Sequence, residues 1–338
     1  MRIHRHFRPL LSHPLLSLPH HITPPSHAKT IHTFTQRLFK LPTPPTPAPN
    51  NHTNLPTFLT HASRIALSPS STTYIGTHYE YTVQQTLRAS NFTLHRTGGR
   101  ADAGIDLLGT WHVPSREHPV RTIVQCKALK TKLGPNLVRE LEGTFASAPA
   151  GWRTGDEVGV LVSPREATRG VREALARSSF PLVWMLVGRD GVLRQALWNG
   201  RVEELGLGGL GVEVRYDSCV GGGENKKKEK DEGASVGLTW DGEGLSGMDA
   251  VEEEMARAEE RWMGMWMGDG GGEMSDAERW ELLEVVERMF PEEKPLLLGM
   301  GMGKWCSALS EEERARVVQT LRGRRALEGD ERVAASSG

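Results

Sequence analysis

Three polar residues whose types suit phosphodiester chemistry lie within residues 98–127. Asp106 follows a Gly-Gly turn and stands in a short apolar run, and a second apolar run ends in Gln125-Cys126-Lys127. Side chains alternate between the two faces of a strand, so Gln125 and Lys127 point the same way. If the two runs pair as a hairpin, Asp106 lies beside both. The spacing therefore predicts a carboxylate, a neutral oxygen ligand and an ammonium group on one patch.

Such a patch is suited to phosphodiester cleavage with Mg²⁺, or with Mn²⁺ in its place. Mg²⁺ takes one or two carboxylates, neutral oxygens and water, polarises a phosphate and lowers the pKa of a bound water. Asp106 and Gln125 are the candidate metal ligands. Lys127 is the candidate for steadying the attacking water and the negative charge of the transition state. In the alternative interpretation, Asp106 only flanks a turn and hydrogen-bonds to backbone.

The order Asp, variable stretch, Glu or Gln, one residue, Lys resembles the active-site pattern of the restriction-endonuclease-like nucleases. DAGIDLLG followed by IVQCK resembles their Mrr-like (type IV restriction) branch, and the resemblance covers about residues 73–187. It implies that Asp106, Gln125 and Lys127 are catalytic and that Glu80 assists from the first helix. The basic N-terminus and the segment WNGRVEEL resemble, more narrowly, the fungal mitochondrial family called "required for respiratory growth protein 7". That resemblance implies a role in mitochondrial genome maintenance or respiratory growth.

Glu80 also has a purely structural interpretation. Thr77 and Glu80 form a T-x-x-E pattern, which is typical of a capping box at the start of a helix. Tyr79, Val83 and Leu87 recur every four residues and predict one face of that helix. Glu80 would then only cap the helix, and the sequence leaves the two roles open.

Basic residues surround the predicted patch and are candidates for phosphate contacts. They are Arg96, Arg100, Lys130 and Lys132. The expected partner is DNA, with RNA open, because these residues carry no base readout. The alternative is an ordinary charged face, since the chain after residue 79 has 34 basic and 42 acidic residues. Binding would then depend on a local basic groove and fall steeply with salt.

The surrounding pattern predicts the elements that position the patch. A helical repeat at residues 137–145 follows the second strand, and the continuous apolar run 158–162 indicates a strand covered on both faces. Residues 166–178 predict a helix, residues 182–187 a buried strand, and residues 192–216 further edge strands. This alternation predicts an α/β fold. With the resemblance, it predicts a restriction-endonuclease-like α/β/α sandwich around a mixed sheet, with a disordered N-terminal tail and a C-terminal helical extension.

Composition divides the chain into five predicted segments. They are a mitochondrial transit peptide at 1–40, a proline-rich linker at 41–72, the α/β domain at 73–216, a Gly-rich charged flexible insert at 217–247, and a helical extension at 248–338. The first 79 residues hold seven basic residues and no acid, which favours import into the mitochondrial matrix over a merely disordered basic tail. No stretch approaches the eighteen or so apolar residues of a membrane helix.

The sequence supports two functional hypotheses. The first is a Mg²⁺-dependent nuclease-like protein acting on DNA. The second is a non-catalytic nucleic-acid-binding or scaffold module, because Gln125 in place of glutamate leaves fewer carboxylates for a metal. Trp262, Trp266 and Trp280 form an aromatic surface on the C-terminal helices that packs either on a core or on a protein partner. The oligomeric state is not predicted.

Overall fold

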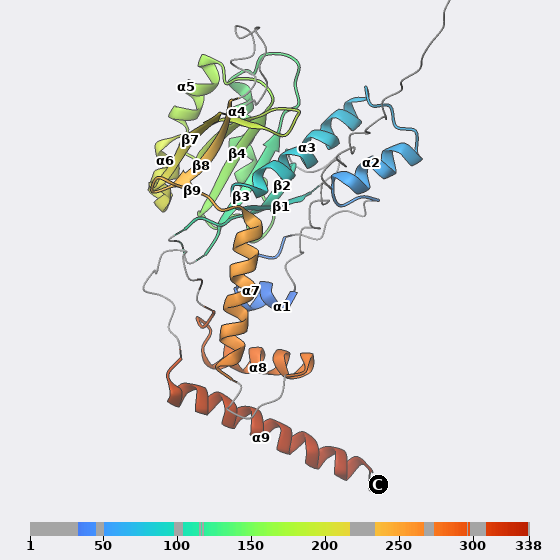
Figure 1. Cartoon of the computed structure of the whole chain (residues 1–338), viewed down its shortest axis with the longest axis vertical. Coiled ribbons are helices and arrows are strands. Elements are labelled where there is room, and N and C mark those ends of the chain that lie inside the picture. The colour runs from blue at the N-terminus through green and yellow to red at the C-terminus, as the bar shows by residue number, and fades with distance from the viewer. Residues whose placement is uncertain are drawn as a thin grey trace, which may run out of the picture. The chain divides into compact units, whose positions relative to one another are not determined.

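The computed structural model describes residues 33–44, 51–97, 104–114, 116, 118–216, 234–266, 274–295, 297 and 309–336, with side chains as far as residue 324. Its largest element is a six-stranded sheet in the order β1-β2-β3-β4-β5-β6 (Figure 1). The strands are β1 Phe92–Arg96, β2 Leu107–Trp111, β3 Val120–Cys126, β4 Glu157–Ser163, β5 Leu182–Val187 and β6 Leu193–Trp198.

The sheet is mixed, as the sequence predicted. β1, β2 and β3 pair antiparallel, β3, β4 and β5 run parallel, and β6 returns antiparallel to β5. The two parallel connections pass through helices α4 Asn136–Ser147 and α5 Arg169–Arg177. In the hairpin, Leu107 pairs with Val124 and Trp111 pairs with Val120. This register fixes where the predicted patch falls.

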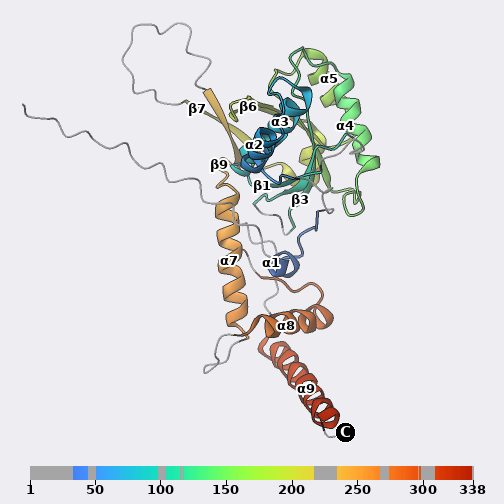
Figure 2. The ribbon, with the colours of Figure 1, turned by 90° about the vertical axis from the view of Figure 1, so that its right-hand side faces the viewer.

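Helices cover both faces of the sheet, which gives an α/β/α arrangement (Figure 2). On one face, helix α3 Thr72–Arg88 packs Val83 and Leu87 against Val124 and neighbouring strand residues. On the other face, Leu141 of α4 shares a core with Leu161 of β4 and with the inner side of α5. The apolar runs predicted as strands are buried because each is covered on both sides.

Helix α3 begins earlier than the capping pattern predicted. Ser71 is its N-cap, and the Ser71 hydroxyl accepts a hydrogen bond from the Tyr74 backbone N–H at 3.1 Å. Thr77 and Glu80 therefore lie inside the helix, and the capping interpretation of Glu80 is wrong. The range predicted as a linker also contains a helix, α2 Leu55–Arg64. It begins with a capping box between Asn54 and Thr57.

A second, three-stranded sheet follows the first. Its order is β7-β8-β9, formed by Leu210–Tyr216, Ala234–Trp240 and Glu243–Gly244, after the short helical segments α6 Gly200–Val202 and η1 Glu203–Leu207. Leu210, Leu238 and Trp240 join the core on the α3 face of the main sheet. Strand β8 thus lies within the range predicted as a flexible insert. Residues 217–233 of that insert lie outside the described residues.

The C-terminal helices have a core of their own. They are α7 Met248–Gly264, α8 Asp276–Met289 and α9 Glu311–Ser336, and they share this core with α1 Thr33–Leu38. Trp262 and Trp266 are buried in it and Trp280 packs against it, so the aromatic surface serves core packing. Helix α8 begins with a capping box between Ser275 and Glu278. In the described part of the chain, no helix is long and apolar enough to span a membrane.

Candidate metal and phosphate site

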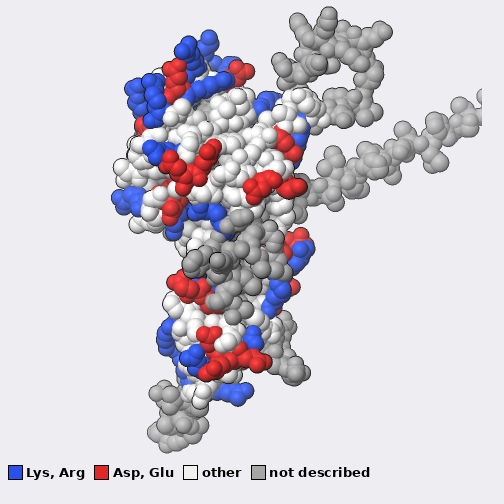
Figure 3. Space-filling model, turned by 90° about the vertical axis from the view of Figure 1, so that its left-hand side faces the viewer, with Lys and Arg blue, Asp and Glu red and all other residues white. Residues whose placement is uncertain are grey.

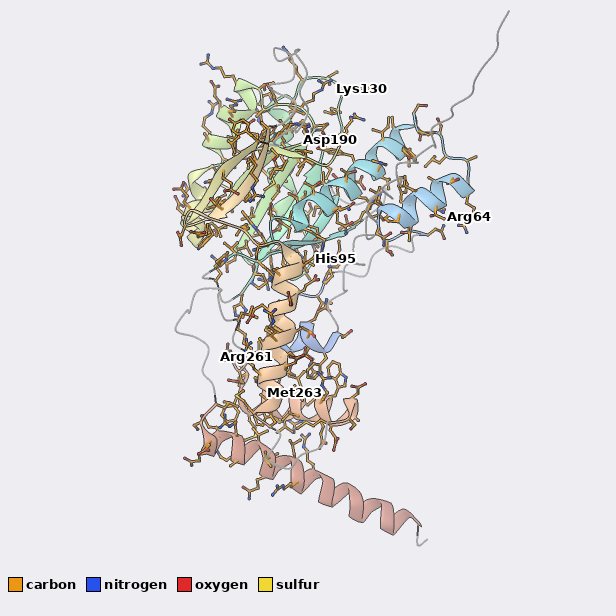
Figure 4. All side chains as sticks on the ribbon, viewed as in Figure 1. Arg64, His95, Lys130, Asp190, Arg261 and Met263 are labelled. Carbon is orange, nitrogen blue, oxygen red and sulfur yellow. The ribbon has the colours of Figure 1, made fainter. Side chains whose placement is uncertain are left out.

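Most of the predicted site residues lie at the end of the main sheet where the parallel strands reach their carboxyl termini. The parallel strands β3, β4 and β5 all end there, and β2 starts there because it runs against β3. Lys130 follows β3 and Asp190 follows β5, and Figure 4 shows both toward the upper end of the sheet. Open α/β sheets bind ligands at the carboxyl ends of their strands. The fold therefore places the predicted patch where a ligand site is commonly found.

Asp106 is the residue before β2, and hydrogen bonds to the end of β3 fix its position. Its Oδ2 accepts a hydrogen bond from the Cys126 backbone N–H at 2.6 Å, and its own N–H donates to the Val124 carbonyl at 3.0 Å. Cys126 stands between Gln125 and Lys127, so the Asp106 carboxylate lies between the other two predicted residues. Asp106 is partly exposed. Its position is thus set by hydrogen bonds to the β3 backbone.

Gln125 offers a buried oxygen. Its side chain is 3% exposed, and its Oε1 has no hydrogen-bond partner among the described residues. Its Nε2 lies 3.0 Å from where a Cβ would stand on Gly104, and Thr144 of α4 borders the same space. Gly104 has φ +82°, a backbone conformation that favours glycine, and its backbone lies close to this amide. A buried acceptor without a donor is a position that a cation or a water can fill.

Glu80 on α3 and Arg96 on β1 form an ion pair. Arg96 Nε donates to Glu80 Oε2, and the two side chains are each 15% exposed. The Arg96 guanidinium also reaches the Thr77 hydroxyl at 3.4 Å. Glu80 was predicted to assist the metal and Arg96 to bind phosphate. In the structure the helix glutamate neutralises the strand arginine, and this pair borders the site.

Lys127 has a partner that the sequence analysis did not identify. Its Nζ lies 2.9 Å from Glu140 Oε2 on α4, and Asn136 Nδ2 donates to Glu140 Oε1 at 3.2 Å. The hydrogen bond from Lys127 holds the pKa of the Glu140 carboxyl below its ordinary value. Little in the sequence indicated this pair. Glu140 precedes Leu141 in the predicted helix, and no local motif links it to Lys127.

These charges converge on Cys126. Burial is the main cause of the raised pKa of the Cys126 thiol, and the negative charges of Asp106 and Glu80 raise it further. The positive charges of Arg96 and Lys127 oppose that rise. All four groups are therefore close enough to affect one thiol, although they come from α3, β1, β2 and the end of β3. With Glu140 beside Lys127, the described residues place three negative and two positive charges in this region.

The outlying basic residues form a looser set. Lys130 and Lys132 are exposed in the loop between β3 and α4, and Arg100 lies outside the described residues. Figure 3 views the side of the molecule that carries α5 and shows basic and acidic side chains interspersed. Among the described residues, no three His, Cys, Asp or Glu side chains gather as a metal site. Any cation here would depend on Asp106, on the Gln125 oxygen and on water.

The α/β domain has recognisable relatives. Residues 71–216 match the family described as Required for respiratory growth protein 7. The match begins at the cap of α3 and ends with β7, so it spans the main sheet and the site at its edge. It supports the narrower of the two resemblances read from the sequence. Residues 217–338, which include α7, α8 and α9, lie outside it.

Individual relatives are named mitochondrial. An uncharacterised mitochondrial protein of Schizosaccharomyces pombe is 36% identical over 152 residues, which are 44% of this chain and 60% of that protein. A Saccharomyces cerevisiae protein named Required for respiratory growth protein 7, mitochondrial, is 27% identical over 176 residues, covering 40% of this chain and 73% of that protein. A Zygosaccharomyces rouxii protein of the same name is 27% identical and covers 35% and 65%. No solved structure matches the chain.

Proposed function

We propose that this chain is a mitochondrial Mg²⁺-dependent nuclease-like protein that acts on DNA in genome maintenance and respiratory growth. The proposal rests on the placement of Asp106, the buried Gln125 Oε1 without a partner, and Lys127 at the carboxyl end of β3 and the adjoining start of β2. The names of the relatives support the mitochondrial part. The matrix is the compartment that the proposal assigns.

The donor set fits a hard divalent cation. Mg²⁺ commonly takes one or two carboxylates and completes its shell with neutral oxygens and water. Asp106 and the Gln125 oxygen would hold it, and when bound it would supply a polarised phosphate and a water of lowered pKa. Mn²⁺ suits the same ligands.

The chain's own groups would do the remaining work. Glu140 holds the Lys127 ammonium at 2.9 Å, so the lysine is oriented before a substrate arrives. Lys127 would steady the attacking water and the charge that builds on the phosphate as the P–O ester bond breaks. Lys130 and Lys132 would contact neighbouring phosphates and set the position of the strand. Arg96, held by Glu80, would keep that carboxylate neutralised.

A second function is favoured by a specific observation. A metal at this site would have Asp106 as its carboxylate ligand, because Gln125 is neutral and Glu80 is paired with Arg96. This arrangement suits a scaffold that retained the fold and binds nucleic acid without cleaving it. Both functions place DNA or RNA at the same end of the sheet. They differ in whether the nucleic acid is cleaved.

The decisive experiment compares full-length wild type with Asp106→Ala and Lys127→Ala for Mg²⁺- and Mn²⁺-dependent cleavage of plasmid DNA and structured RNA. Losing a transition-state contact worth about 4 kcal/mol slows a reaction roughly a thousandfold. Asp156→Ala is the matched control, because Asp156 is exposed and lies outside the site. Cleavage by wild type and the control that both site variants lose would support the nuclease. Binding without cleavage by all four proteins would support the scaffold.

A further inference from the structure

An N-terminal segment forms part of the C-terminal helical core. Helix α1 Thr33–Leu38 lies within the range predicted as a transit peptide, yet Phe34, Leu38 and Phe39 are 3%, 1% and 4% exposed. They share one apolar cluster with α7, α8 and α9. Representative members on those helices are Val251, Trp262, Leu283, Val286 and Val317. A helix of six residues is not stable alone in water, so this packing is what orders α1.

The contacts are specific as well as apolar. The Phe34 ring meets the Trp280 ring edge-on, with centroids 5.1 Å apart, and the Arg279 guanidinium lies 4.8 Å from the Phe34 ring centre. Arg37 Nη2 lies 2.6 Å from Glu287 Oε2 on α8. Aromatic and cation–π contacts of this kind add to the energy of burial.

Two further hydrogen bonds join this N-terminal segment to the C-terminal helical region. Thr35 Oγ1 donates to Glu259 Oε2 on α7 at 2.6 Å, and Lys40 Nζ donates to the Pro291 carbonyl. The segment therefore contacts α7, α8 and the chain after α8. The helical core is discontinuous in sequence, and the α/β domain is inserted between its two parts.

We infer that residues 33–41 remain in the mature protein and that any import processing cuts upstream of Thr33. A basic, acid-free composition continues to residue 79, so composition alone does not mark the end of a presequence. Burial limits where the presequence can end. A cut after residue 40 would remove three large buried side chains and expose the core of α7 and α8 to water. The inference rests on the proposed mitochondrial import but not on nuclease activity.

The first test is the N-terminus of the mature chain. The full-length protein with a C-terminal tag is expressed in a fungal cell, purified from isolated mitochondria, and its terminal peptide is identified by mass spectrometry. The first residue is expected at or before Thr33, and an uncut chain satisfies this as well. A first residue anywhere after Thr33 overturns the inference. A catalytically inert protein that begins at or before residue 33 leaves it standing.

The second test asks whether α1 holds the helical core together. In purified full-length protein, Phe34→Ala with Leu38→Ala is compared with the control Thr33→Ala with Gln36→Ala. The measurement is the rate of trypsin cleavage after Arg261 in α7, which Figure 4 labels. Removing two large core side chains should speed this cleavage by on the order of a hundredfold. Equal rates in all three proteins would overturn the inference.

A charge swap covers the case in which the double alanine variant aggregates. Arg37→Glu and Glu287→Arg should each speed cleavage after Arg261 by roughly two- to fivefold, because each leaves a repulsive pair. The combined swap should return the rate close to that of wild type. If the combined variant is worse than either single variant, Arg37 does not lie against α8 in solution and the inference fails.

Discussion

The approach of β1 to β2 leaves no room for a side chain at Gly109, and this makes a sharp test of the register that places Asp106. Gly109 is the central residue of β2 and pairs with Leu94 on one side and Thr122 on the other. A Cβ at Gly109 would lie 1.9 Å from the Thr93 carbonyl oxygen and 2.9 Å from the Leu94 Cα. Both neighbours are backbone atoms in a hydrogen-bonded ladder, so neither can rotate away.

The expected cost follows from that contact. Real Cβ atoms stay at least about 3 Å from such neighbours, so β1 would have to move by roughly 1 Å. Adding a methyl group to a packed core costs typically about 1–3 kcal/mol, and rigid neighbours place Gly109→Ala at or above the upper limit. A loss of about 3 kcal/mol lowers the melting temperature of a domain of this size by roughly 6–12 °C.

Hydrogen exchange followed by mass spectrometry is the assay, because it reports the stability of the β2 and β3 amides separately from that of the C-terminal helices. Gly143→Ala is the matched control. Gly143 is exposed inside α4, and its added Cβ would meet nothing within 4 Å. That substitution should stabilise the domain by up to about 1 kcal/mol, since alanine is the better helix former. If Gly109→Ala protects these amides as well as wild type does, the register of β1 on β2 is wrong.

Two further predictions concern buried polar groups. Burial raises the pKa of Glu293 to about 7, although its hydrogen bond from Trp262 opposes the rise. Between about pH 4.5 and 7 the folded state then binds more protons than the unfolded state. The free energy of unfolding of the helical core should therefore fall by up to about 3 kcal/mol as the pH rises from 4.5 to 7. Glu293→Gln should flatten this pH dependence, and an unchanged slope would contradict it. For the Gln125 oxygen, Gln125→Leu should leave the free energy of unfolding unchanged or raise it by about 1 kcal/mol, because an unpaired buried acceptor is lost. The same variant should lower Mg²⁺ affinity measured by calorimetry, and a clear loss of stability with intact affinity would count against the reasoning.

Regular, local patterns allowed much of the fold to be predicted from the sequence. The apolar runs at 158–162 and 182–187 became β4 and β5 within one residue at each end, because a strand buried on both faces is apolar throughout. Helix α3 shows the limit of such patterns. Its T-x-x-E motif looks like a helix start, but the true cap is Ser71 and Glu80 turns toward Arg96.

Features that depend on contacts between distant segments could not be predicted. Strand β8 is preceded by a Gly-rich charged run, and this composition hid an alternating strand pattern at residues 234–240. Helix α1 has a basic composition typical of a presequence, and only its packing on α7 and α8 reveals its structural role. The same holds for Glu140, whose side chain reaches Lys127 from 13 residues away. Long side chains choose partners by tertiary geometry, and sequence spacing carries little information about that choice.

Local sequence patterns predict one part of the site and miss another, and both parts bear on the choice between the two functions. Asp106 and Gln125 are neighbours because a hairpin register makes them so. The charge balance around them depends instead on two pairs that join separate elements, Glu80 with Arg96 and Lys127 with Glu140. The first pair would keep a carboxylate from the proposed metal, and the second orients an ammonium group. A buried oxygen without a donor has an energetic cost of about 1–3 kcal/mol. A bound cation would offset this cost, as a buried water would, and only the cation would also use the Asp106 carboxylate. This is why we place the nuclease-like function ahead of the scaffold.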